Sequence, residues 1–357
     1  MFWVFLINME SKKVLRCALI GAGRMGKTHA VNLLAASAYG IPLKLEAVYD
    51  QKAENMQAFG ENFGSHYCVS SVEEILENKD IEALVITSST PSHAVLIRSA
   101  LKHGKHVFCE KPGAVDIKEC QELIDECAQY PKLKVMIGFN RRFDESYGQV
   151  IKKTHSGDLG EVLSFNLTSR DREEAEERFI ATSGGMFKDM AIHDFDLLSH
   201  LLKADCEQVY ALGGCRMVPA YGKHNDIDFG QVTFVFNNKE KEQIIGNLQL
   251  GRKNAYGYDM RLEVFGTDGM AYVNNKKVND ITYYSSSITR DQEVQGFPER
   301  FSQSYREELR AFALAVINDT NSFPTLNDAK RALVLAEACQ RSLDEGRPIK
   351  KEEFIQQ

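Results

Sequence analysis

A glycine-rich segment near the N-terminus is the feature that most constrains the fold. The β-prone run 14–20 leads into Gly21-Ala22-Gly23-Arg24-Met25-Gly26, after which the chain has the character of a helix. In such a strand–turn–helix unit the first glycine makes a tight turn and the second lets a pyrophosphate approach the backbone. The third lets the helix pack against the strand. The segment therefore predicts a dinucleotide site that includes Gly21, Gly23, Arg24, Met25 and Gly26.

A carboxylate follows at the position that such a site requires. The next strand-like run, 43–49, ends at Asp50, near the offset of ~20 residues at which an acidic side chain accepts hydrogen bonds from the adenine ribose. A carboxylate there repels a 2′-phosphate, and Gln51 brings no cation to offset it, so NAD is favoured over NADP. The alternative is that Asp50 only closes a turn at the end of a strand.

Strand and helix patterns then alternate through the first part of the chain. Apolar runs at 83–87, 106–109 and 133–137 are separated by helical segments. This order predicts an α/β fold with a parallel sheet, in a Rossmann domain spanning residues 14–140. Ligands bind such sheets at the carboxyl ends of the strands. The residues expected at that edge are Thr87, Ser88, Pro91, Glu110, Lys111 and Arg141.

Lys111 can polarise a hydroxyl or carbonyl beside a nicotinamide ring, because it follows a strand that ends at the same edge as the glycine loop. The alternative is a surface lysine before a proline turn.

The second half of the chain has a different pattern. From residue 161 onward, longer alternating segments predict an open, mostly antiparallel sheet in an α+β domain at 141–325. The helix at 326–357 is expected to pack back against the first domain. We expect one face of the sheet to be covered by helix and the other by a second subunit, in a homodimer or homotetramer.

The segment from Gly184 to Asp196 has helical spacing, which puts Asp189, His193 and Asp196 on one face. An imidazole that titrates near neutrality, one turn from a carboxylate, is a typical arrangement for general acid/base catalysis. The alternative is an exposed polar helix face.

The composition and net charge of the chain limit the kinds of partner that it can bind. The chain has 357 residues, a net charge of −7 and 43% hydrophobic residues. An acidic protein of this kind favours a small polar ligand over nucleic acid or an anionic membrane. The eight cysteines form no C-x-x-C pair, which predicts reduced thiols in the cytoplasm and no zinc site. Residues 1–13 are interpreted as an extension.

Several motifs together resemble those of the Gfo/Idh/MocA oxidoreductases. They are the glycine loop with His29, Thr90-Pro91-Ser92-His93, Gly104 through Glu110-Lys111-Pro112, and Gly184 through Asp196. The resemblance covers about 14–345 and, within the family, is greatest to the inositol dehydrogenases. It implies NAD-dependent oxidation of a secondary alcohol on a small cyclic polyol or sugar, without a metal. It also implies a cis peptide bond between Lys111 and Pro112.

The resemblance also implies roles for individual residues. Lys111 would hydrogen-bond the reacting hydroxyl, His193 would be the general acid/base, and Asp189 would bind substrate hydroxyls and assist the histidine. Further residues in matching motifs are expected to bind cofactor (His93, Glu110, Arg141) or substrate (Asn140, Asp171, Tyr256, Tyr258). The charged run 172–178 departs from the family pattern and leaves the substrate open. A sugar or trans-dihydrodiol dehydrogenase and a non-catalytic NAD(P)-binding regulator remain as alternatives.

Overall fold

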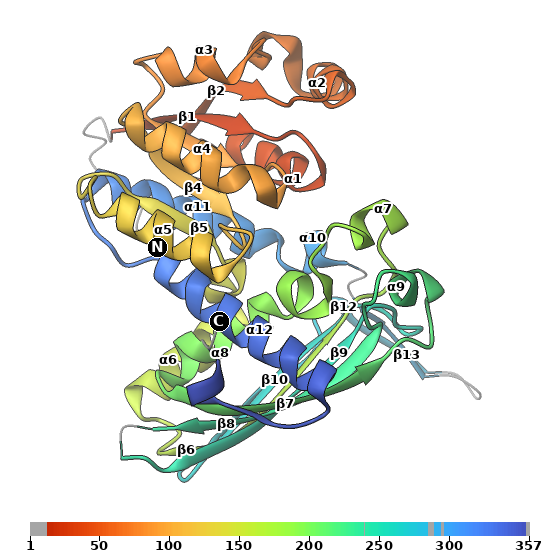
Figure 1. The fold of residues 1–357 in the computed structure, drawn as a ribbon. Coiled ribbons are helices and arrows are strands. Elements are labelled where there is room, and N and C mark those ends of the chain that lie inside the picture. Colours follow the sequence, from red (N-terminus) through yellow and green to blue (C-terminus); the bar gives the residue numbers. More distant parts are fainter. Residues whose placement is uncertain (1–12, 239, 285–288, 294–295, 355–357) are drawn as a thin grey trace, which may run out of the picture. The chain divides into compact units, whose positions relative to one another are not determined.

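The structure is a computed structural model that describes residues 13–238, 240–284, 289–293 and 296–354 (Figure 1). Apart from Lys13, the expected extension 1–13 lies outside this part of the chain. The chain divides into two compact units. The first comprises residues up to Gly113 together with Glu122–Gly138 and Arg306–Thr325, and the second comprises Ala114–Gln121, Phe139–Tyr305 and Leu326 onward.

The first unit contains a five-stranded parallel sheet in the order β2-β1-β3-β4-β5. Its strands are nearly continuous apolar runs because helices cover both faces of such a sheet; all four residues of β3 are fully buried. The strands are β1 (Leu15–Ile20), β2 (Leu43–Tyr49), β3 (Ala83–Ile86), β4 (His106–Glu110) and β5 (Val135–Gly138).

Helices connect these strands, as the alternating pattern predicts. They are α1 (Arg24–Leu34), α2 (Ala53–Phe59), α3 (Val72–Glu77), α4 (Thr90–Lys102) and α5 (Ile117–Cys127). The strand order reverses between β1 and β3, which are neighbours although β2 separates them in the chain. Ligands bind at such a switch point, outside the carboxyl ends of the strands. The glycine loop follows β1 at this point.

The second unit contains a seven-stranded sheet in the order β11-β10-β6-β9-β8-β7-β14. Only β6 and β9 pair in parallel among these described strands, so the sheet is mostly antiparallel, as predicted. The strands are β6 (Val162–Arg170), β7 (Asp205–Gly214), β8 (Phe229–Asn237), β9 (Gln243–Gly251), β10 (Asp259–Gly266), β11 (Met270–Val273) and β14 (Ile349–Lys350). A separate hairpin joins β12 (Lys277–Tyr284) to β13 (Thr289–Glu293).

Helices pack on one face of the larger sheet, where alternate side chains of each strand are buried. The helix α12 (Leu326–Glu345) packs on β7 and on α8 (Ile192–Leu202). The remaining helices are α6 (Glu145–Ser156), α7 (Glu177–Ile180), α9 (Pro219–Lys223), α10 (Phe297–Arg300) and α11 (Ser302–Ile317).

The division of the chain differs from the expected boundaries at the C-terminal end. Residues 326 onward lie in the second unit, where α12 contacts β7 and α8 through its buried alanine and leucine face. The same unit includes Ala114–Gln121 of the expected first domain, and α12 bonds to this segment at Cys120 and Gln121. Residues 306–325, which include most of α11, belong instead to the first unit.

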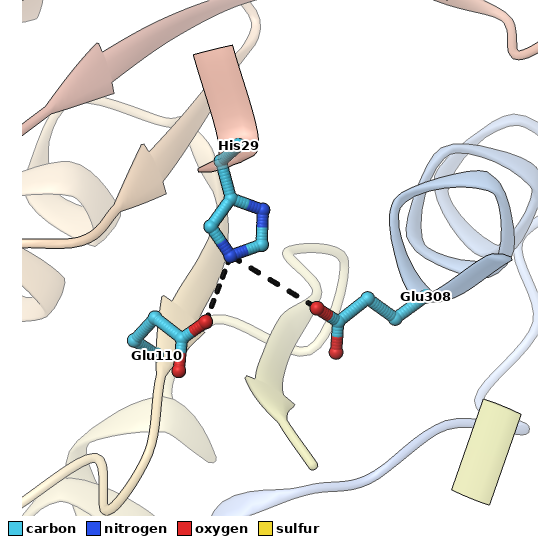
Figure 2. A group of neighbouring side chains, drawn as sticks. All are labelled: His29, Glu110 and Glu308. Carbon is cyan, nitrogen blue, oxygen red and sulfur yellow. Dashed lines mark hydrogen bonds and ion pairs between the residues drawn. The ribbon is translucent and has the colours of Figure 1, made fainter. Parts of the chain in front are cut away.

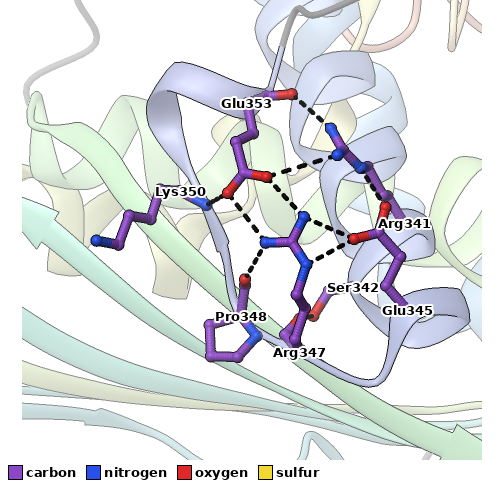
Figure 3. Close-up of polar contacts among 7 residues, drawn as sticks. All are labelled: Arg341, Ser342, Glu345, Arg347, Pro348, Lys350 and Glu353. Carbon is purple, nitrogen blue, oxygen red and sulfur yellow. Dashed lines mark hydrogen bonds and ion pairs between the residues drawn. The ribbon is translucent and has the colours of Figure 1, made fainter.

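The chain after α12 is tied back to the second unit (Figure 3). The hydroxyl of Ser342 donates to the carbonyl of Arg347 and accepts from the amide of Ala211 on β7, and it is completely buried. Outside this buried bond, Arg347 pairs with the carboxylates of Glu345 and Glu353, each at 2.6 Å. Solvent-exposed pairs of this kind contribute little stability. The buried hydroxyl and the pairing of β14 with β7 therefore hold the C-terminal segment.

Candidate functional site

The glycine loop of the first unit is built so that side chains would not fit. Gly21 has a φ of 101°, and a Cβ there would lie 2.5 Å from the amide nitrogen of Ser88. A Cβ on Gly26 would lie 2.0 Å from the carbonyl oxygen of Gly21. Thr87, at the end of β3, donates its hydroxyl hydrogen to the same carbonyl at 2.6 Å. These contacts hold the loop at the β1–β3 switch point.

Gly23 differs from the other two glycines because a Cβ there would meet nothing within 4 Å. Gly23 is the N-cap of α1, and within the described chain no side chain caps this helix and no acidic residue lies in its first turn. Backbone amides at a helix N-terminus bind anions, and the dipole of the helix adds to this attraction. The loop thus has the open approach and the donors that a pyrophosphate needs.

Asp50 closes the other side of this loop. Its Oδ2 accepts hydrogen bonds from the amide of Ala22 at 2.7 Å and from the side chain of Asn55 at 3.0 Å, and its Oδ1 accepts from the amide of Lys52. The carboxylate predicted from the sequence therefore lies directly beside the glycine loop. The residues of this unit fit a dinucleotide: an uncapped helix N-terminus for the phosphates and a carboxylate for a ribose.

The other cofactor candidates of the first unit lie after β3 and β4. The hydroxyl of Ser88 bonds to that of Ser92, Pro91 is exposed in the first turn of α4, and Arg24 and Met25 begin α1. His93 is buried and donates through Nε2 to the carbonyl of Ser88, and burial lowers its pKa. Lys111 follows β4, and the expected cis peptide bond to Pro112 is present.

The polar segment of the second unit is not the continuous helix that we predicted. Gly184 and Gly185 each have a φ of 84°, a π-helical turn spans Met186–Met190, and α8 begins only at Ile192. Asp189 lies in the π-helical turn and His193 in the first turn of α8, and both side chains are partly exposed. Asp196 is buried with its carboxylate bound to Arg142, so it does not share an exposed face with them.

A buried arginine that sequence reasoning missed holds Asp189. Arg252 follows β9, is 3% exposed, and donates from Nη1 to Oδ2 of Asp189 at 2.8 Å. Its guanidinium lies over the ring of Tyr221, 5.4 Å from the centroid, and 3.9 Å from a carboxylate oxygen of Asp226. The only available signal was a charged residue at the end of an apolar strand, because Arg252 and Asp189 are 63 residues apart.

Two further buried pairs fix the helix that carries His193. Arg141 donates to Asp194, which also accepts from the hydroxyl of Ser169 at 2.8 Å. Arg142 binds Asp196 through Nε at 2.8 Å and also contacts Asp328 of α12. The guanidinium of Arg141, expected at the cofactor, is thus engaged inside the second unit, and its cofactor contact stays a prediction.

The expected substrate residues of the second unit differ in exposure. Asn140 is 2% exposed, and its Nδ2 has no hydrogen-bond partner among the described residues. Tyr258 is 8% exposed, and burial followed by the charge of Asp171 raises its pKa well above the usual value. Tyr256 is 58% exposed and donates its hydroxyl hydrogen to Asp259. The buried side-chain amide of Asn140 and the partly exposed carboxylate of Asp171 can both form hydrogen bonds with the hydroxyl groups of a polar ligand.

The charged run 172–178 is mostly exposed and leads into the short helix α7. Within the described residues, none of the helices has the length and the apolar character that crossing a membrane requires.

A parallel sheet with an open glycine loop and an adjacent carboxylate, followed by a second α/β unit, defines a dinucleotide-binding protein. Comparison with known proteins agrees: the profile "Oxidoreductase family, NAD-binding Rossmann fold" matches residues 15–139 and "Oxidoreductase family, C-terminal alpha/beta domain" matches residues 151–350. The chain belongs to this Gfo/Idh/MocA family, which confirms the assignment from its motifs.

Similar proteins include several that are named as inositol dehydrogenases. The myo-inositol 2-dehydrogenase of Thermotoga maritima is 32% identical, over 96% of this chain and 100% of its own length. The inositol 2-dehydrogenase of Rhizobium meliloti is 34% identical, over 94% and 98%. Among solved structures, the scyllo-inositol dehydrogenase of Lactobacillus casei with bound NAD(H) and scyllo-inositol has a TM-score of 0.85 and 30% identity, covering 95% of this chain and 99% of that one.

Proposed function

We propose that this protein is an NAD-dependent dehydrogenase that oxidises a secondary alcohol of a cyclic polyol, myo-inositol or a related inositol, to the ketone. The observation that carries the proposal is the nearly full-length likeness to a dehydrogenase whose structure holds NAD(H) and scyllo-inositol. The side chains that such a reaction needs are present at Lys111, Asp189 and His193.

Each of these three side chains has a distinct task in the proposed reaction. Lys111 donates a hydrogen bond to the reacting hydroxyl oxygen and stabilises the negative charge that develops there. His193 takes the hydroxyl proton as general base. Asp189, held by Arg252, accepts hydrogen bonds from neighbouring substrate hydroxyls and assists His193. Asn140, Asp171 and Tyr258 are proposed to bind further hydroxyls, and Tyr256 to line the approach.

The cofactor is proposed to be held by the glycine loop and Asp50. Gly21, Gly23 and Gly26 and the N-terminus of α1 would bind the pyrophosphate, and Asp50 the adenine ribose. When bound, NAD accepts a hydride at C4 of its nicotinamide ring. NADP is disfavoured because its 2′-phosphate would lie beside the carboxylate of Asp50. We also propose that Arg24, Met25, Thr87, Ser88, Pro91 and His93 line the cofactor.

Steady-state turnover with a panel of inositols, sugars and trans-dihydrodiols, followed at the NADH absorbance band, tests the function. We expect turnover with at least one inositol. Lys111→Ala and His193→Ala should each lower kcat by about 10²–10⁴-fold, the usual range for a lost acid/base group. Lys102→Ala and His103→Ala, on and just after α4 in the first unit, serve as matched controls and should retain activity.

Three results would contradict parts of this proposal. Turnover of sugars or trans-dihydrodiols without any inositol would change the substrate class. Binding of NAD without turnover of any substrate would favour a regulator. Unchanged kcat in both Lys111→Ala and His193→Ala would refute the mechanism.

We further propose that two copies associate through the outer face of the seven-stranded sheet. Six large apolar side chains on five of its strands point away from the helices and are exposed: Leu212, Phe229, Ile245, Phe265, Met270 and Tyr272. Ile245, Phe265 and Met270 lie in one register row across β9, β6, β10 and β11, and exposed apolar side chains gathered on one sheet face favour a protein interface. Light scattering coupled to size-exclusion chromatography should report a dimer or tetramer that Ile245→Lys dissociates, and a monomeric wild type would refute the interface.

We propose a cytoplasmic location, since all eight cysteines are free thiols in the structure and reduced thiols are typical of that compartment. Labelling of fractionated cells with an antibody would test this.

A further inference from the structure

Three ionisable side chains meet in the interior of the first unit, where β4 ends (Figure 2). They are His29 on α1, Glu110 at the end of β4, and Glu308 on α11. His29 and Glu308 are completely buried and Glu110 is 6% exposed. Nε2 of His29 lies 2.7 Å from Oε1 of Glu110 and 3.9 Å from Oε1 of Glu308.

Glu308 is the unusual member of this group. Neither of its carboxylate oxygens has a hydrogen-bond partner among the described residues, although both are buried. The titratable groups that face it there are His29 from α1 and Glu110 from β4. Phe108 packs edge-on against His29 and also against Phe312 of α11, so the surroundings are apolar. An ionised carboxylate without compensation is very costly in such surroundings, so a buried group of this kind takes up a proton instead.

The pKa of Glu308 agrees with this conclusion, since burial raises it well above the usual value and the negative charge of Glu110 raises it further.

A bound cation would be a different way to neutralise the two carboxylates beside the imidazole. However, 2.7 Å between Nε2 and Oε1 is a hydrogen-bond distance. Neighbouring ligands of an ion with bonds near 2.1 Å lie about 3 Å apart or more, so the geometry favours a proton between these atoms.

Glu110 connects this group to the neighbouring lysine. Its Oε1 faces His29, while its Oε2 accepts a hydrogen bond from the backbone amide of Lys111 at 3.3 Å. The orientation of the Glu110 carboxylate therefore affects the position of the backbone amide of Lys111. A second negative charge at Glu308 would repel Glu110 and compete with it for His29.

We propose that Glu308 is a positioning residue for Lys111: in its protonated form it lets His29 and Glu110 pair, and Glu110 then fixes the backbone of Lys111. The assignment of Lys111 to the reacting hydroxyl rests on the proposed function, whereas the protonation of Glu308 does not. Glutamine has the shape of a protonated glutamate and carries no charge. Glu308→Gln should therefore reproduce the wild-type arrangement.

Chemical unfolding between pH 4.5 and 9 tests the protonation. A folded-state pKa raised above 4.5 gives stability that is complete below pH 4.5 and is lost as pH rises toward the folded-state value. The unfolding constant of the wild type, relative to that of Glu308→Gln, should thus rise with pH, by up to about tenfold per pH unit between pH 4.5 and the folded-state pKa. Glu307→Gln, the neighbouring and more exposed glutamate of α11, is the control and should show no such trend. A ratio that stays constant with pH overturns the proposal.

Two readouts at Lys111 test the positioning. Glu308→Gln should keep kcat near the wild-type value, whereas Glu308→Ala should lower kcat by about 10- to 100-fold, the cost of a small misplacement, with the Kd for NAD within about twofold. Amine acetylation of Lys111, measured by mass spectrometry, should change in rate in Glu308→Ala and not in Glu308→Gln. Equal loss of kcat in both variants, an unchanged acetylation rate in Glu308→Ala, or a stoichiometric metal in the purified protein would each overturn it.

These measurements separate the proposal from the proposed function. A wild type without turnover of any polyol would refute the dehydrogenase, while unfolding and acetylation would still decide the role of Glu308. If Glu308→Ala does not fold, Glu308→Asp replaces it in the acetylation and kcat measurements, because it moves the carboxyl group away from His29 while retaining an acid.

Discussion

Removing the guanidinium of Arg252 should destabilise the second unit, and a second substitution at Asp189 should restore part of this stability without restoring activity. Arg252→Met keeps an unbranched side chain that can pack on Tyr221 but removes the hydrogen bond to Asp189. Breaking a buried ion pair by removing one partner usually costs about 3–5 kcal/mol because it leaves the other charge uncompensated. The side chain of Asp189 is 16% exposed, so water compensates part of this loss and we expect about 3 kcal/mol.

Part of this loss should be assignable to Asp189. The carboxylate of Asp226 also faces Arg252: its Oδ1 accepts hydrogen bonds from the amides of Met186 and Ile227, whereas its Oδ2, 3.9 Å from Arg252, has no hydrogen-bond partner among the described residues. Adding Asp189→Asn to Arg252→Met should therefore recover at least about 1 kcal/mol, since the uncompensated charge is gone. The double variant should recover stability without recovering activity, because the substrate contact proposed for Asp189 is lost.

Thermal and urea unfolding of the four proteins in this cycle is the assay. A loss of about 3 kcal/mol corresponds to a fall in Tm of about 6–12 °C in a unit of 150–250 residues. Arg178→Met, at a side chain that is 80% exposed, is the matched control and should change stability by no more than about 0.5 kcal/mol. If the double variant is no more stable than Arg252→Met, the two residues are not coupled and the reasoning is refuted.

Further predictions concern the cofactor loop and the acid stability. Asp50→Asn should lower kcat/KM for NAD by about 10- to 100-fold by weakening charged hydrogen bonds to the ribose, and raise the NADP/NAD ratio; an unchanged ratio would contradict the role of Asp50. Gly26→Ala should destabilise the first unit by about 1–3 kcal/mol through overpacking, whereas Gly23→Ala should leave stability unchanged and weaken only NAD binding, as calorimetry can show. Burial, followed by the charge of Arg142, lowers the pKa of His200 from 6.5 to about 4. The free energy of unfolding should thus fall as the pH drops from 6.5 toward 4, because His200 takes up a proton in the unfolded chain before it does so in the folded protein. In His200→Gln the free energy of unfolding should depend less on pH over this range.

The sequence predicted those parts of the fold that depend on local pattern. Each strand of the parallel sheet was expected because short apolar runs alternate with helical segments, and the switch-point position of Gly21 follows from that order. The region 184–196 was predicted less well. Counting residues at helical spacing placed Asp189 and His193 on one α-helix, but the two glycines and the π-helical turn change the register before α8 begins.

The missed contacts share one property, which is that the two partners are far apart in the sequence. Arg252 and Asp189 are separated by 63 residues, and Arg141 and Asp194 by 53. No local period contains that information. Glu308 is different, because it lies among the buried residues Tyr305, Leu309 and Phe312 of α11. A charged residue on the apolar stripe of a predicted helix was a signal that periodicity alone could have found.

Buried arginine–aspartate pairs explain how a short helix that carries a histidine can be held in one orientation. Asp194 and Asp196 closely follow His193 in α8 and bind Arg141 and Arg142, two consecutive residues of one turn. Such pairs give little net stability compared with well-packed apolar residues, since both partners lose their hydration. What they do provide is direction, because a guanidinium donates hydrogen bonds to a carboxylate in few geometries. Rotation of α8 about its axis would break both pairs at once, so the position of the His193 side chain is fixed by contacts that need not touch it.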